Sequence, residues 1–137
     1  MRIFANLVFC LVLAAGAARA QAPLTVEGCG APIPAKIENE ADFANIGADP
    51  VQFRQGAAPK FLAAIGALCR TSPKHQALVA SRVTSIVFTP APGGEEDVTA
   101  YLLSKTLHLE IFDPAYHAGP FRKALAAALE KGPMAPR

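Results

Sequence analysis

The chain has 137 residues, of which 52% are hydrophobic, with 13 Lys and Arg against 11 Asp and Glu. This length suits one globular domain and leaves no room for a second. Arg2 and Arg19 lie in the first 20 residues, so the remainder carries 11 basic and 11 acidic residues. A neutral remainder with scattered Lys and Arg gives little support for a nucleic-acid partner, because nucleic-acid binders usually present a basic face.

The first 20 residues have the pattern of a cleavable signal peptide. Met1-Arg2 form a positive start, residues 3–18 carry no charge, and Ala18-Arg19-Ala20 is a small-x-small cleavage pattern. A retained membrane anchor is the alternative, but a spanning helix needs about 20 apolar residues. We therefore expect a signal peptide over 1–20 and a single small domain over 21–137, exported to a periplasm or secreted. The membrane is then a partner only through the signal peptide, before cleavage.

The cysteines predict one disulfide. Cys10 leaves with the signal peptide, so Cys29 and Cys69 remain as a pair. An even cysteine count in an exported chain favours a disulfide. Metal-binding and redox cysteines, the alternatives, are usually two residues apart, whereas these two are far apart in the sequence. We expect a structural bridge that closes a long loop.

The first part of the mature chain predicts a lead-in, a short strand and the start of a helix. Residues 21–34 hold two Gly and three Pro and predict irregular structure. Residues 35–43 predict a short strand or edge segment. Asp49 can cap a helix whose first position suits Pro50. That first helical turn is expected to stop by Gly56.

Two further helices are predicted before the main strands. Phe61, Ile65 and Leu68 recur at the spacing of an amphipathic helix that opens near Pro59. Ser72-Pro73 interrupts this helix, because a proline disfavours helical structure in the residue before it. Ser72 is also a good cap for a second, shorter helix.

The strand pattern begins after this second helix. Residues 83–88 are rich in β-branched side chains. A longer strand is predicted over 98–112, with apolar residues at odd positions such as Tyr101, except Lys105, and polar residues at even positions. We expect these two strands to pair as an antiparallel hairpin.

A last helix should run from 119–120 and end at Gly132. The order of elements predicts an α+β fold: a small antiparallel sheet with at least one hairpin, packed against two to four helices and held by one disulfide.

Three polar residues of the longer strand form the candidate site. Thr106, His108 and Glu110 alternate along the strand and therefore share one face. They can bind a partner, or supply an acid-base pair or metal ligands if His75 or His117 comes near. The plain alternative is a solvated sheet face, since neither His-x-His nor His-Glu-x-x-His spacing is present.

The loop over 92–97 is the second feature. Glu95, Glu96 and Asp97 are three adjacent carboxylates after two glycines, and they lack the alternating oxygen ligands of a calcium loop. They can engage a basic partner or simply keep the loop soluble. The sequence also contains no nucleophile elbow, no phosphate-binding glycine loop and no haem attachment motif. We expect no cofactor.

These observations leave two functional hypotheses. The first is a non-catalytic interaction or binding module of the cell envelope or secretome, with a protein partner and no nucleic acid. The alternative is a small hydrolase or metal-dependent enzyme with a site near His108 and Glu110, because catalytic groups can come together from distant positions in a sequence.

Overall fold

The structure is a computed structural model, and it describes residues 23–134. The predicted signal peptide over 1–20 and the mature start at Gln21 lie outside these residues. Between residues 23 and 134, no helix is both long enough and apolar enough to cross a membrane.

A five-stranded sheet forms the centre of the fold, in the order β1-β2-β3-β5-β4. The strands β1 and β2 are antiparallel, β2–β3 and β3–β5 are parallel, and β4–β5 are antiparallel. The α+β class, the presence of hairpins and the helices are therefore confirmed, but the sheet is mixed. The strands are β1 (Leu24–Val26), β2 (Ile33–Ile37), β3 (Ser85–Pro90), β4 (Val98–Leu103) and β5 (Thr106–Ile111).

The predicted long strand over 98–112 is two strands. Ser104 and Lys105 form a tight turn between β4 and β5, and Ser104 takes a left-handed backbone with φ 55°. The strand predicted over 83–88 corresponds to β3, which pairs in parallel with β5 and not as an antiparallel hairpin partner. The prediction of that hairpin was wrong because β4 and β5 pair with each other, and β5 lies between β4 and β3 in the sheet.

Helical segments fill the connection from β2 to β3. They are η1 (Glu40–Ile46), α2 (Pro50–Gln52), η2 (Phe53–Ala57), α3 (Ala58–Thr71) and α4 (Pro73–Arg82), and α5 (Ala118–Lys131) follows the sheet.

The helix boundaries follow local chemistry. The carboxylate of Asp49 accepts a hydrogen bond from the Gln52 N–H at 3.3 Å, as expected of a cap. The Ser72 hydroxyl likewise accepts from the His75 N–H at 3.3 Å and caps α4. The expected stop at Gly56 was wrong, because the chain continues through a π-helical turn into α3. The strand predicted over 35–43 ends at Ile37, because Asn39 takes a left-handed backbone (φ 54°) before η1.

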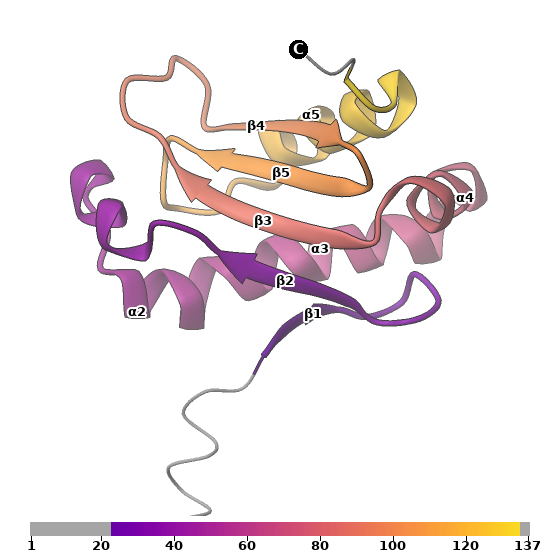
Figure 1. Cartoon of the computed structure of the whole chain (residues 1–137), viewed down its shortest axis with the longest axis horizontal. Coiled ribbons are helices and arrows are strands. Elements are labelled where there is room, and N and C mark those ends of the chain that lie inside the picture. Colours follow the sequence, from indigo (N-terminus) through magenta and orange to yellow (C-terminus); the bar gives the residue numbers. More distant parts are fainter. Residues whose placement is uncertain (1–22, 135–137) are drawn as a thin grey trace, which may run out of the picture.

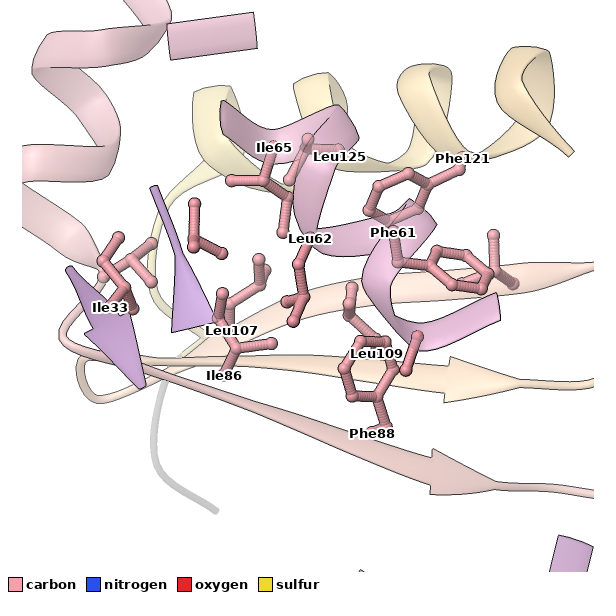
Figure 2. Close-up of a cluster of buried hydrophobic side chains, with 14 of the residues drawn as sticks. Ile33, Phe61, Leu62, Ile65, Ile86, Phe88, Leu107, Leu109, Phe121 and Leu125 are labelled. Atoms are coloured by element: carbon pink, nitrogen blue, oxygen red, sulfur yellow. The ribbon is translucent and has the colours of Figure 1, made fainter. Parts of the chain in front are cut away.

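Both long helices, α3 and α5, cover the same face of the sheet, and no helix of residues 23–134 covers the other face, called here the open face (Figure 1). Side chains from the two helices meet those of the central strands in one apolar core (Figure 2). Phe61 of α3 and Phe121 of α5 pack edge to face, with ring centroids 4.8 Å apart. The core drawn in Figure 2 contains Ile33, Phe61, Leu62, Ile65, Ile86, Phe88, Leu107, Leu109, Phe121 and Leu125.

The Cys29–Cys69 disulfide is confirmed, and it attaches the segment after β1 to α3. The two Cα atoms are 5.2 Å apart, and both cysteines are buried. Gly66 makes the close approach of this segment possible, because a Cβ atom there would lie 2.2 Å from the Glu27 carbonyl oxygen. The bridge and the glycine together hold the edge of the sheet against α3.

We predict that the double substitution Cys29→Ala, Cys69→Ala lowers the free energy of unfolding by about 2–4 kcal/mol, because it opens a closed loop in the unfolded chain. The loop spans 40 residues. Urea denaturation followed by circular dichroism measures the change. Reduction should shift the wild-type midpoint by a similar amount and leave the double variant unchanged. An unchanged midpoint after reduction of the wild type would contradict the prediction.

Candidate functional site

The open face of the sheet, on which the described part of the chain places no helix, carries the candidate site. Residues alternate along each strand, so one set points into the core and the other points to this open face. On β5 the core set is Leu107, Leu109 and Ile111, all at most 1% exposed. The open set on the same strand is Thr106, His108 and Glu110, each partly exposed. The structure therefore places the three predicted residues on one face, as their spacing indicated.

Tyr101 was predicted to lie with the apolar, core-facing residues of the strand, and this was wrong because it lies on the open face beside His108. The tight turn at Ser104 and Lys105 pairs Tyr101 with His108, so odd positions of β4 share a face with even positions of β5. The side chains of Tyr101 and His108 stack with ring centroids 4.9 Å apart and planes 2° from parallel. A single uninterrupted strand would have put these two side chains on opposite faces. The signal that could have revealed the pair is the polar dipeptide Ser104-Lys105 between two apolar runs.

One row of residues crosses four strands of the open face. Lys36 lies opposite Val87, Val87 opposite His108, and His108 opposite Tyr101. Val87 is only 3% exposed although it lies on this face. In this row the buried Val87 therefore lies between Lys36 on one side and the Tyr101–His108 pair on the other.

Two carboxylates border the aromatic pair. Glu110 lies next along β5, opposite Thr99 of β4, and Glu38 follows β2, where its N–H donates to the Phe88 carbonyl at 2.9 Å. Glu38 also forms an exposed ion pair with Lys36 at 3.2 Å. The pKa of the Tyr101 phenol is raised above 10.0, first by its partial burial and then by the negative charges of Glu110 and Glu38. The open face is thus electronegative at the phenol.

Thr106 has a local structural role at one end of this face. Its hydroxyl lies 2.9 Å from the Ser85 hydroxyl on β3, and the two hydroxyls share a hydrogen bond. Thr106 and Ser85 lie opposite each other in the parallel pair. The hydroxyl of Thr106 is therefore already engaged, and we centre the candidate site on His108, Glu110 and Tyr101.

The three histidines of the chain lie in three different environments. His108 stacks on Tyr101, His75 lies 3.5 Å from a Glu130 oxygen, and His117 lies 3.1 Å from an Asp113 oxygen. In residues 23–134, the one group of three His, Cys, Asp or Glu side chains close enough to share a metal ion is Asp97, Asp113 and His117. Neither His108 nor Glu110 belongs to it, so the geometry offers no third metal ligand beside the predicted pair.

The Asp97, Asp113 and His117 group lies where β5 ends and α5 begins. The Asp97 carbonyl accepts from the N–H groups of Phe112 and Asp113, both at 3.0 Å. Asp113 in turn accepts from the Ala115 N–H at 2.9 Å with one oxygen and pairs with His117 through the other. These contacts fix the turn into α5. Such a set of two carboxylates and an imidazole has the donor chemistry to hold a divalent metal ion.

Ser72, His75 and Glu130 form a second polar set, between α4 and α5. The Ser72 hydroxyl is 2.7 Å from Nδ1 of His75, and the Lys74 ammonium donates to Glu130 at 2.8 Å. The hydrogen bond and positive charge of Lys74 lower the pKa of Glu130 below 4.5. Because Ser72 caps α4 and Glu130 joins α4 to α5, we assign this set to structure.

The acidic residues of the loop before β4 border a cavity. Glu95, Glu96 and Asp97 line a surface cavity of about 690 Å³, and α5 contributes Lys123 to its wall. Gly94 is pressed against the Phe112 ring, since a Cβ atom there would lie 2.3 Å from it. The loop is therefore held beside α5 near Lys123.

We predict that the Tyr101 phenol ionises above pH 10.0. The chain has two tyrosines and no tryptophan, so Tyr116→Phe leaves Tyr101 as the sole phenol, and the ultraviolet absorbance of tyrosinate reports its midpoint. Glu110→Gln in that background should move the midpoint toward 10, because it removes one negative charge. The neutral phenol is the form that the fold favours, so its contribution to stability is present below pH 10 and is lost as the pH rises through the folded midpoint. An unchanged midpoint in Glu110→Gln would contradict the assigned contact.

The open face combines an aromatic pair, two carboxylates and a lysine on rigid strands, which is an arrangement suited to recognition of a charged surface. The structure places no third metal ligand beside His108 and Glu110 in the residues it describes. A comparison of the chain with family models, curated proteins and solved structures found no match.

Proposed function

We propose that this chain is a non-catalytic binding module, exported to the cell envelope or beyond, that captures a protein partner on its open sheet face. The observation that carries the proposal is the Tyr101–His108 stack, which lies on a sheet face that no helix covers and is bordered by Glu110 and Glu38. Tyrosine is among the residues that most often dominate binding energy at protein interfaces. Its position on paired strands holds it rigidly before a partner arrives.

The partner should present a lysine or arginine to this face. Two carboxylates lie near the phenol, and carboxylates form strong charge-assisted hydrogen bonds with guanidinium and ammonium groups. An aromatic ring adds cation–π attraction for the same groups. Lys36 pairs with Glu38, which leaves Glu110 as the carboxylate that most directly meets an incoming cation. The proposal therefore names a basic protein segment as the ligand class.

Selection from a random-peptide library displayed on phage tests this proposal. We expect the peptides that the chain retains to be enriched in arginine and lysine. One selected peptide is then synthesised and its affinity is measured by isothermal titration calorimetry. Glu110→Gln and Tyr101→Ala should each weaken binding about tenfold or more, in line with the loss of a hydrogen bond to a charged group or of an interface tyrosine.

The matched control is Glu27→Gln, which neutralises an exposed carboxylate away from the open face. Its affinity for the peptide should remain within about twofold of the wild type, because an exposed charge outside the contact contributes little. Enrichment of acidic peptides would contradict the proposed ligand class. Equal losses in Glu27→Gln and Glu110→Gln would contradict the proposed face.

A further inference from the structure

Charged residues are divided unequally between the three main helices and the rest of this molecule. The helices α3, α4 and α5 carry seven Lys and Arg residues and one acidic residue, Glu130. The rest of residues 23–134 carries three Lys and Arg residues and ten acidic residues. The net charge is therefore +6 on the three helices and −7 on the strands, connections and loops. The overall neutrality found in the sequence conceals this separation. The seven helical cations are Lys60, Arg70, Lys74, Arg82, Arg122, Lys123 and Lys131.

Most of these cations form no ion pair within residues 23–134, although Lys123 shares a cavity with Glu95, Glu96 and Asp97. Within residues 23–134, Lys74 is the one member of the seven that pairs with a carboxylate, and its partner is Glu130. Arg70 donates to the Glu27 carbonyl, and Arg82 donates to the Leu129 carbonyl, so these two remain charged. Six of the seven side chains are exposed, and Arg82 is partly buried. The helical layer thus presents its charge to solvent.

A cavity of about 590 Å³ lies along α3 between two of these cations. Its lining includes Lys60 and Arg122, three alanines of α3, and the larger side chains Leu68 and Tyr116. The exposed large hydrophobic residues in the described part of the chain are Val51, Leu103 and Met134, and none of them belongs to α3, α4 or α5. Protein interfaces usually need bulky anchors at their centre, and the two large side chains of this cavity, Leu68 and Tyr116, are partly buried. The exposed positive charge is therefore the main attraction that this layer offers.

We propose that the helical layer formed by α3, α4 and α5 docks on an anionic lipid surface. Anionic headgroups attract basic residues by about 1 kcal/mol for each Lys or Arg near the membrane, with no need for apolar insertion. The expected export brings the folded chain to such a surface and away from nucleic acid, the other large anionic partner. Both long helices lie on one side of the sheet (Figure 1). Docking through them turns the open sheet face toward solvent.

Cosedimentation with phospholipid vesicles tests the proposal. The protein is taken as the cell processes it, and it is mixed with vesicles of phosphatidylcholine alone or of phosphatidylcholine with phosphatidylglycerol. We expect binding only when phosphatidylglycerol is present, and we expect it to disappear at high salt, where the Debye length falls to about 3 Å at ~1 M. Binding to pure phosphatidylcholine, or binding that resists salt, would overturn the proposal. So would the absence of binding to both kinds of vesicle.

Two triple variants distinguish the effect of cations in the helical layer from the effect of overall net charge. Lys60→Glu, Arg122→Glu, Lys131→Glu removes three cations from the layer, and it should reduce vesicle binding at least about tenfold. The matched control Lys36→Glu, Arg54→Glu, Lys105→Glu makes the same change in net charge with the three remaining described cations outside these helices. It should retain binding within about threefold. Equal loss in both variants would overturn the assignment to the helical layer.

Further controls test whether the variants are folded and whether another anionic ligand binds more tightly. The neutral variant Lys60→Gln, Arg122→Gln should weaken vesicle binding by an intermediate amount, and circular dichroism checks that each variant is folded. Tighter binding to a DNA duplex than to anionic vesicles, measured at one salt concentration, would overturn the lipid assignment. Tyr101→Ala should bind vesicles like the wild type, so failure of the peptide experiment and failure of the vesicle experiment are distinguishable.

Discussion

Packing of α3 and α5 against a single face of the sheet is the constraint on which the rest of this structure depends. The large side chains of the two helices, such as Phe61 and Phe121, are buried against strands β3 and β5. Burial of such aromatic residues supplies much of the stability of a small domain. Because this one layer takes up the long helices, no element among residues 23–134 is left to cover the second sheet face (Figure 1). Such a face requires polar, partly exposed residues. Thr106, His108 and Glu110 of β5 meet this requirement, whereas Val87 of β3 is apolar and only 3% exposed.

The tight turn at Ser104 and Lys105 decides which side chains share that face. Shifting a strand by one residue moves all of its side chains to the opposite face. A two-residue hairpin turn has the same effect: odd positions before the turn share a face with even positions after it. Alternation within 106–111 was correctly predicted, because those six residues form one uninterrupted strand. Alternation over 98–112 as a whole was wrong because Tyr101 pairs with His108 across the turn. The sequence therefore predicted the β5 part of the candidate site, His108 and Glu110, and missed its β4 part, Tyr101.

Local features of the fold could be predicted, whereas its pairings could not. The caps at Asp49 and Ser72 depend on hydrogen bonds within three residues, and the Cys29–Cys69 bridge follows from a cysteine count. Parallel pairing of β2 with β3 and of β3 with β5 joins segments separated by helices or by another strand. Such contacts depend on the shared core and leave no periodic pattern in the strands themselves. Glu38 reaches the site through this pairing, so no local signal marks it.

The distribution of charge over the folded molecule is the property that the sequence predicts least well. Apart from the adjacent Arg122 and Lys123, Lys and Arg are several residues apart along the helices, so no basic run stands out in the sequence. Folding packs α3, α4 and α5 against one another, and these helices carry a net charge of +6 against −7 on the other described residues. The resulting charge separation gives the molecule a preferred orientation in an electric field, which a neutral chain with mixed charges would lack. In the proposed docking, an anionic surface attracts the helices, and the open face with the Tyr101–His108 stack then points away from that surface, toward the proposed basic protein segment.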